Sequence, residues 1–157
     1  MNSLIYSVLE NGGIPLVLNL ETKKIEFFAK MVARRIEDKE VGWGKIKSYI
    51  TQEEMEYPLT LEQEKKIQEG FEWAKEQEWL VSFDKNMTTQ DIQAFVMKAK
   101  ALYPHDAKIV LFVDYIQLQV QNSMREREEI ANLSRFYKKL AGIMDISAVS
   151  YTHLTLP

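Results

Sequence analysis

Two acidic residues directly follow short apolar runs, where their carboxylates could take part in chemistry. Glu21 follows the run at residues 14–20, and Asp114 follows the run at residues 109–113. If both runs are strands of one parallel sheet, both carboxylates lie at the edge where such sheets bind ligands. One carboxylate could then hold Mg²⁺ while the other orients an attacking water, as phosphoryl transfer requires. The alternative is that each acid only caps the helix that follows its strand.

The elements that would position these acids follow from the apolar pattern. Short apolar runs predict strands at residues 14–20, 79–83 and 109–113. Apolar residues at helical spacing, with capping residues such as Thr60 and Thr88, predict helices at residues 2–9, 25–36, 45–50, 60–78, 88–103 and 125–141. In the helix that Thr88 begins, one apolar stripe is formed by Ile92, Phe95, Val96, Ala99 and Leu102.

Strands that alternate with helices in this way indicate right-handed parallel crossovers. The predicted fold class is therefore α/β, with a doubly wound, mainly parallel sheet flanked by helices. A chain of 157 residues has the length of one ordinary domain.

Composition excludes several other kinds of chemistry. The chain has no cysteine and only two histidines, so disulfides, thiolate zinc sites and histidine clusters are not expected. Any metal site must use carboxylates. The net charge of −3 gives no overall basic surface for nucleic acid, so a DNA contact would have to be local. The sequence shows no signal peptide and no apolar run long enough for a membrane span, so we expect a cytoplasmic protein without a membrane partner.

Four segments, IVLFVDYIQL, LVLNLE, FDKNMTTQDIQAFVMKAK and REREEIANLSRFYKKLA, carry a family resemblance. Together they resemble the ATPase core of DnaB-type replicative DNA helicases, a RecA-like fold. The run IVLFVDYIQL is similar to the family's Walker B strand, and LVLNLE is similar to its strand ending in Ser-Leu-Glu, with Asn19 at the serine position. The segments FDKNMTTQDIQAFVMKAK and REREEIANLSRFYKKLA resemble the elements before and after Walker B. The resemblance covers residues 1–148, which we predict to be a partial RecA-like helicase ATPase domain.

The resemblance assigns roles to particular residues. It implies that Asp114 holds the Mg²⁺ of bound ATP, that Glu21 is the catalytic base, and that Gln117 couples the nucleotide to the following loop. Gln117 could equally be a solvated loop amide. Phosphate contacts with DNA are conceivable for Arg125, Arg127 and Arg135, although acidic neighbours favour a solvated helix start for the first two.

For the parent protein, the resemblance implies ATP and Mg²⁺ as cofactors, single-stranded DNA as substrate and a homo-hexamer. A primase and a helicase loader are possible partners. The host would be a bacterium or a phage. Two other functions remain open: a RecA-like recombinase or other RecA-fold ATPase, and a non-hydrolysing helicase loader or adaptor.

The family's phosphate loop, the Walker A motif ending in Gly-Lys-Ser or Gly-Lys-Thr, does not occur in the sequence. We expect it within about ten residues upstream of Met1. We therefore expect a fragment truncated at both ends, which by itself is inactive and has no useful ATP affinity. Residues 149–157, VSYTHLTLP, resemble a translated sequencing adapter, so we predict a non-native tail there.

Overall fold

A computed structural model describes residues 1–114, 116–120 and 125–150, without the side chains of residues 117 and 118. Its elements, in chain order, are α1 (Asn2–Glu10), β1 (Ile14–Asn19), α2 (Lys24–Ile36), α3 (Trp43–Thr51), α4 (Leu61–Glu76), β2 (Leu80–Ser82), α5 (Thr89–Leu102), β3 (Ile109–Asp114), the 3-10 helix η1 (Ile116–Gln119), α6 (Glu126–Met144) and β4 (Ser147–Ser150).

The chain divides into two compact units. The first, which we call the sheet unit, holds Met1, Ser7–Glu21 and the chain from Glu78 onward. The second, which we call the helical unit, holds Asn2–Tyr6 and Thr22–Gln77. The single domain expected over residues 1–148 stays a prediction.

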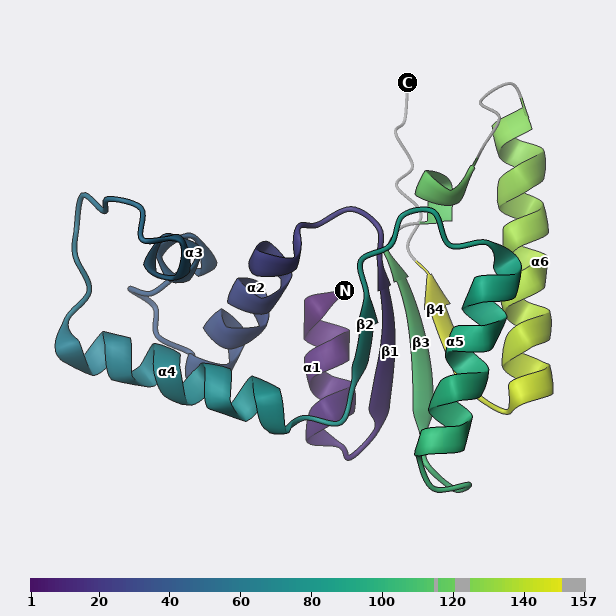
Figure 1. The fold of residues 1–157 in the computed structure, drawn as a ribbon, viewed down its shortest axis with the longest axis horizontal. Coiled ribbons are helices and arrows are strands. Elements are labelled where there is room, and N and C mark those ends of the chain that lie inside the picture. Colours follow the sequence, from purple (N-terminus) through teal and green to yellow (C-terminus); the bar gives the residue numbers. More distant parts are fainter. Residues whose placement is uncertain (115, 121–124, 151–157) are drawn as a thin grey trace. The chain divides into compact units, whose positions relative to one another are not determined.

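The sheet unit contains four strands in the order β2-β1-β3-β4 (Figure 1). All three neighbouring pairs are parallel. The two inner strands, β1 and β3, are also those that precede the two candidate acids. This arrangement confirms the predicted parallel α/β sheet flanked by helices.

Alternation along β1 and β3 separates the two faces of the sheet. Leu16 and Leu18 of β1 join Leu111 and Val113 of β3 in one core. That core also contains residues of α5 and α6, which lie on the same side of the sheet in Figure 1. The residues between them point to the opposite face, since side chains alternate along a strand. All six residues of β1 are buried, so this strand is covered on both faces.

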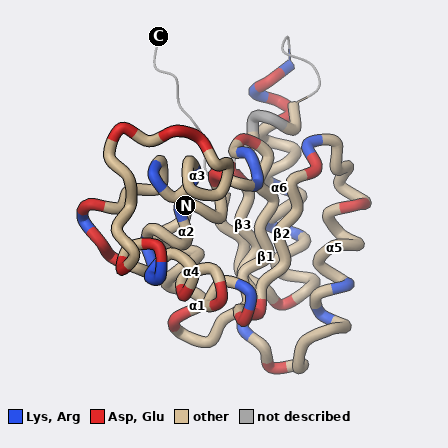
Figure 2. Tube along the Cα trace, turned by 60° about the vertical axis from the view of Figure 1, so that its left-hand side comes forward, with Lys and Arg blue, Asp and Glu red and all other residues tan. Residues whose placement is uncertain are grey.

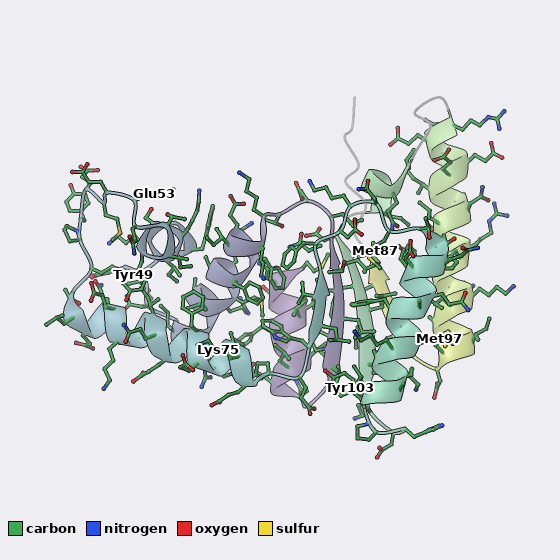
Figure 3. The ribbon with its side chains drawn as sticks, in the orientation of Figure 1. Tyr49, Glu53, Lys75, Met87, Met97 and Tyr103 are labelled. Atoms are coloured by element: carbon green, nitrogen blue, oxygen red, sulfur yellow. The ribbon has the colours of Figure 1, made fainter. Side chains whose placement is uncertain are left out.

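The helix that begins at Thr88 has the predicted cap but not the full predicted stripe. Thr88 and Asp91 form a capping box at the start of α5. Ile92, Val96 and Ala99 are buried as expected, but Leu102 is 60% exposed. Leu102 is the last residue of α5, and the next residue, Tyr103, packs against the core instead (Figure 3).

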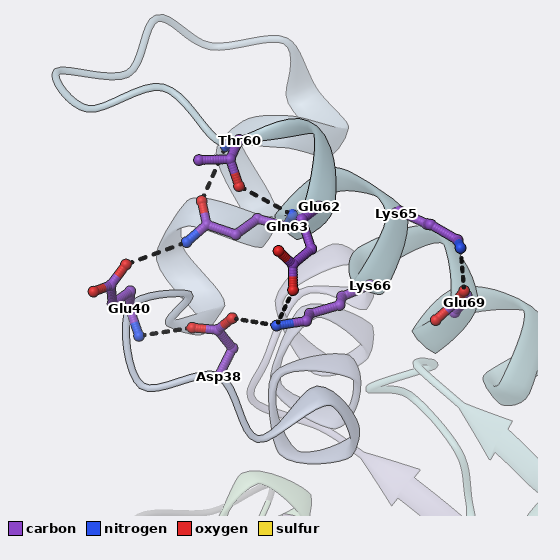
Figure 4. Close-up of polar contacts among 8 residues, drawn as sticks. All are labelled: Asp38, Glu40, Thr60, Glu62, Gln63, Lys65, Lys66 and Glu69. Carbon is purple, nitrogen blue, oxygen red and sulfur yellow. Dashed lines mark hydrogen bonds and ion pairs between the residues drawn. The ribbon is translucent and has the colours of Figure 1, made fainter.

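In the helical unit, α2, α3 and α4 pack around a small core of Ala29, Val32, Val41, Ile46 and Ile67. Thr60, predicted to cap this helix, forms a capping box with Gln63 at the start of α4. There the backbone N–H of Gln63 donates to Thr60 Oγ1 at 3.2 Å, and the backbone N–H of Thr60 donates to Gln63 Oε1 at 3.0 Å (Figure 4).

A polar network ties the loop after α2 to the first turns of α4. Lys66 Nζ lies 3.2 Å from Asp38 Oδ2 and 3.2 Å from Glu62 Oε1 (Figure 4). The backbone N–H of Glu40 donates to Asp38 Oδ1 at 3.0 Å, and this bond, followed by the one from Lys66, lowers the pKa of Asp38. The network therefore fixes the loop at the N-terminus of α4.

Strand β4 reaches into the segment that was predicted to be non-native. Val149 pairs with Phe112, and Ser150 pairs with Val113, both in parallel register with β3. Residues 151–157 lie outside the described part of the chain. The origin of the tail at residues 149–157 stays a prediction, but its first two residues belong to the sheet.

Candidate functional site

The two candidate acids lie at the same edge of the sheet. In the parallel pairing of β1 with β3, Asn19 is the partner of Asp114. The backbone N–H of Leu20 then donates to the carbonyl oxygen of Asp114 at 2.8 Å. Glu21 is the next residue. Both acids therefore stand at the carboxyl ends of adjacent inner strands, as the sequence predicted.

The surroundings of the two carboxylates differ. Asp114 is half-buried at the end of β3, whereas Glu21 is exposed just beyond β1. Asp114 is also the one charged residue in the four described strands, while the other charges lie on helices and loops (Figure 2). A half-buried carboxylate at this position could hold a cation.

Asp114 fits one kind of metal site better than another. In the part of the chain that the structure describes, no three His, Cys, Asp or Glu residues gather in a group that could hold a metal ion. Ca²⁺ takes six to eight oxygen ligands, whereas Mg²⁺ is commonly held by one or two carboxylates with phosphate oxygens and water. A single half-buried carboxylate suits Mg²⁺ that arrives with a phosphate ligand.

The segment after Asp114 is anchored to α6. The hydroxyl of Tyr137 donates to Gln119 Oε1 at 2.5 Å, which ties η1 to the middle of α6. Tyr137 is buried, and this burial raises the pKa of its phenol well above the usual range. Gln117 also belongs to η1, but its side chain lies outside the described part of the structure, so its coupling role stays a prediction.

The three candidate DNA-contacting arginines lie in or next to α6. Arg125 directly precedes the helix, Arg127 lies in its first turn, and both side chains are exposed. Arg135 is exposed too, but its Nη2 donates to Asn132 Oδ1 at 2.8 Å and its Nε to the carbonyl oxygen of Ala131 at 3.2 Å. Asn132 also lines a cavity of about 320 Å³ between the start of α5 and α6, near Met87 (Figure 3).

Sequence reasoning overlooked one residue at this edge. Asn19 was noted only as a departure from the family's serine, yet it is 2% exposed and is the buried polar residue of the described core. The sequence feature that could have drawn attention to Asn19 is its polar side chain at the end of a strand whose other residues are all apolar.

The sequence profile of the family described as DnaB-like helicase C terminal domain matches residues 5–155. The chain belongs to this family. The match spans both strands that carry the candidate acids, and so agrees with the motif resemblance.

Solved structures share the fold of this DnaB-like chain. One, whose title describes an ATPase domain, superposes with a TM-score of 0.75 at 16% identity, over 95% of this chain and 50% of that one. A second, titled "The Structure Of A DnaB-Like Replicative Helicase And Its Interactions With Primase", gives a TM-score of 0.71 at 17% identity, over 90% of this chain and 32% of that one. The DnaB-like chain thus spans half or less of the length of these relatives.

A search of curated proteins gave no match to this DnaB-like chain. Among its described helices, none is both long enough and apolar enough to cross a lipid bilayer.

Proposed function

We propose that this chain forms part of the ATP-hydrolysing core of a replicative DNA helicase, which couples Mg-ATP hydrolysis to movement on single-stranded DNA. The observation that carries the proposal is the position of Glu21 and Asp114 after adjacent parallel strands, in a chain matched to the DnaB-like family over residues 5–155.

In this proposal, Asp114 holds the metal. Its half-buried carboxylate stands at the end of β3, where Asp114 pairs with Asn19 of β1 and the preceding residue, Val113, also pairs with Ser150 of β4. When bound with ATP, Mg²⁺ would neutralise charge on the phosphate oxygens. The role of Asp114 is to fix where that charge is neutralised.

In the same proposal, Glu21 orients and deprotonates the attacking water. It is exposed, so water reaches its carboxylate, and it lies at the same edge as Asp114. A carboxylate in this place can accept a hydrogen bond from the attacking water, orient it and take its proton as the bond to phosphorus forms. The two acids therefore have separate tasks.

Other parts of the active unit must come from outside these 157 residues. The proposal needs a phosphate loop with a Gly-Lys-Ser or Gly-Lys-Thr end, whose backbone N–H groups and lysine offset the charge of the triphosphate. We also propose that the active protein assembles into a homo-hexamer. One structural relative is described in its title by its interactions with primase. For this protein, we propose a primase and a helicase loader as partners.

The test of this function is replacement of Glu21 by Gln in the full-length protein. The amide keeps the size of the side chain but cannot take a proton, so hydrolysis should fall by at least about 100-fold while ATP affinity stays within about threefold. Steady-state phosphate release and calorimetric ATP binding measure the two quantities.

The matched control is Glu10→Gln, another exposed acid, which ends α1 before β1 begins. Glu10→Gln should leave both quantities unchanged. Hydrolysis by Glu21→Gln at the rate of the unmodified protein would remove Glu21 from the mechanism.

A DNA contact by α6 is tested through salt dependence. A phosphate-binding arginine contributes about 0.7 to the slope of log affinity against log salt for single-stranded DNA. Arg127→Ala should reduce that slope by about this amount if the side chain meets a phosphate. Arg135→Ala should reduce it less, because the guanidinium already donates to Ala131 and Asn132. An unchanged slope in both variants and in Arg125→Ala would exclude these arginines.

A further inference from the structure

The cavity of about 320 Å³ in the sheet unit lies among segments that follow the strands. Its lining comes from the start of α5, which follows β2, and from η1 and α6, which follow β3. Such segments gather at the carboxyl ends of parallel strands, where α/β folds bind ligands. Val113 belongs to the core beneath α5 and α6, so the side chain of Asp114, the next residue, points to the opposite face. The cavity is therefore separate from the proposed metal position.

One part of the lining is apolar. Met87, Leu133 and Phe136 line the cavity and also pack against the core of the sheet unit (Figure 3). The Ser82 hydroxyl donates to the sulfur of Met87 at 3.2 Å, which helps to hold this side chain in place. Ligand pockets commonly measure about 300–1,000 Å³, so this cavity suits a single ring system better than a whole nucleotide. The flat ring of Phe136 offers a stacking surface for such a ligand.

Two side-chain amides of the lining are held by their oxygen atoms. Gln119 Oε1 accepts from the Tyr137 hydroxyl at 2.5 Å. Asn132 Oδ1 accepts from Arg135 Nη2 at 2.8 Å. The NH₂ group of each amide is then the end that can donate to a ligand. Glu129 also lines the cavity, and an ionised carboxylate only accepts, so the lining offers both donors and an acceptor.

These groups match the edge of a nucleobase that carries an exocyclic amino group. Cytosine and adenine each present an amino donor beside a ring nitrogen that accepts. The amino group could donate to Glu129 while the ring nitrogen accepts from Gln119 or Asn132. Thymine has a carbonyl oxygen in place of the amino group, and the carboxylate would repel it. The lining therefore favours cytosine or adenine over thymine.

Cations beside the cavity favour a base that belongs to a nucleic-acid strand. Arg135 contacts Asn132 directly, and Lys139 lies three residues after Phe136 in α6, so it is one turn away on the same side of the helix. Both cationic side chains are exposed. Proteins that bind single strands commonly combine cations for the phosphates with an aromatic side chain on which a base stacks.

We propose that this cavity holds one unpaired cytosine or adenine base of single-stranded DNA, with Phe136 stacked on the base and Glu129 accepting from its amino group. The inference rests on the proposed function, which makes single-stranded DNA the substrate. It adds a preference among bases to contacts that would otherwise recognise phosphates alone.

The experiment measures binding of the full-length protein to labelled oligodeoxycytidine and oligodeoxythymidine strands of equal length, by fluorescence anisotropy. Because both strands carry the same phosphates, the ratio of the two affinities reports the bases. The deoxycytidine strand should bind about fivefold more tightly or better. Equal affinity for the two strands would overturn the proposal.

The stacking role is tested with Phe136→Leu, which keeps an apolar side chain but removes the flat ring. This variant should bind the deoxycytidine strand about fivefold more weakly or worse. The matched control is Phe95→Leu, since Phe95 is a partly buried residue of α5 that packs against the same core outside the cavity lining. It should leave both affinities unchanged, and equal losses in the two variants would show that packing, and not stacking, is responsible.

The preference itself is tested at Glu129. Glu129→Ala should reduce the preference for the deoxycytidine strand to less than about twofold, because the acceptor for the amino group is gone. Its matched control is Glu126→Ala, which removes an exposed acid from the first turn of α6 outside the lining. That variant should raise both affinities together and keep their ratio. A ratio that Glu129→Ala leaves unchanged would overturn the proposed role of the carboxylate.

The base of ATP has the same chemistry, so ATP binding is measured in the same variants. If Phe136→Leu and Glu129→Ala weaken ATP binding and leave both DNA affinities unchanged, the cavity takes the base of the nucleotide and the proposed DNA contact is wrong. If the unmodified protein hydrolyses ATP and binds both strands equally, this inference fails while the proposed function stands. If it binds neither strand, the proposed movement on DNA fails and this inference fails with it.

Discussion

At the residue scale, a missing side chain sets how closely two helices of the helical unit approach. Gly70 is buried in α4. A Cβ atom added there would lie 2.8 Å from Cγ1 of Val32 and 3.1 Å from Cγ2 of Ile36. Both neighbours are β-branched residues of α2, which have one strongly preferred rotamer in a helix and cannot easily turn away.

We expect Gly70→Ala to destabilise the chain. Overpacking costs about 1–3 kcal/mol and the gain in helix propensity returns about 1 kcal/mol, so a net loss of about 1 kcal/mol should appear. Urea unfolding followed by circular dichroism measures it. Gly142→Ala in α6 is the matched control, because an added Cβ meets nothing within 4 Å. That variant should gain about 0.5–1 kcal/mol, and a stabilised Gly70→Ala would show that the helices can move apart.

At the candidate site, the two acids could be predicted from the sequence, but the pairing of residues between the strands could not. Glu21 and Asp114 were found because an acid after an apolar run is visible in the sequence, and parallel strands bring such ends together. The pairing of Asn19 with Asp114 was not visible, because register between strands far apart in the sequence depends on the packing of the whole sheet.

At the element scale, the start of α5 is fixed by local hydrogen bonds. The hydroxyl of Thr88 accepts from the backbone N–H of Asp91 at 3.2 Å and donates to Asp91 Oδ2 at 2.6 Å. The backbone N–H of Thr88 donates to the same carboxylate oxygen at 2.9 Å. These bonds satisfy donors at the helix start that would otherwise lack a partner within the helix.

Thr88→Ala should therefore lower the free energy of unfolding by about 1 kcal/mol, the usual cost of losing an N-terminal cap. Its matched control is Thr89→Ala, since Thr89 is the adjacent residue, is also exposed and lies inside the first turn. Thermal or urea unfolding compares the two. Equal losses in both variants would show that the cap contributes nothing of its own.

The same cap predicts a dependence on pH. The bonds from the Thr88 side chain and backbone lower the pKa of Asp91 below its ordinary value. A carboxyl with a lowered pKa in the folded state stabilises the fold above its unfolded pKa, near about 3.9, and loses that contribution as pH falls through the folded value. The stability difference between the unmodified chain and Asp91→Asn should be constant above about pH 5 and shrink below about pH 4. A difference that persists unchanged at about pH 2.5 would contradict this origin.

Elements were predicted well where the signal was local and less well at their ends. The capping residues Thr60 and Thr88 were both predicted from local patterns, and both form capping boxes in the structure. Leu102 was misplaced because helical spacing does not show where the sheet beneath a helix ends. The extent of β4 was also hidden, since Val149 and Ser150 are held by pairing with β3 rather than by any local signal.

At the scale of the whole molecule, each unit has a core of its own. The core of the sheet unit includes Ile92 of α5, and the core of the helical unit includes Ile46 of α3, and both side chains are fully buried. Proteins open in cooperative units that follow such packing.

Truncating one core should therefore loosen mainly its own unit. Ile46→Ala should cost about 2–5 kcal/mol of local stability and speed amide hydrogen exchange in α2, α3 and α4 more than in β1 and β3. Ile92→Ala should show the reverse pattern. Hydrogen exchange measured by mass spectrometry resolves the segments, and uniform acceleration in both variants would mean that the two cores open as one.

The order of strands also governs how the protein can be made. β1 lies beside β3 in the sheet, yet roughly ninety residues separate Glu21 from Asp114 along the chain. At about 5–20 residues per second, a ribosome completes β1 on the order of ten seconds before it completes β3. During that interval an almost entirely apolar strand has no neighbour on one side, so nascent chains should depend on chaperones that hold such segments until translation has passed β3.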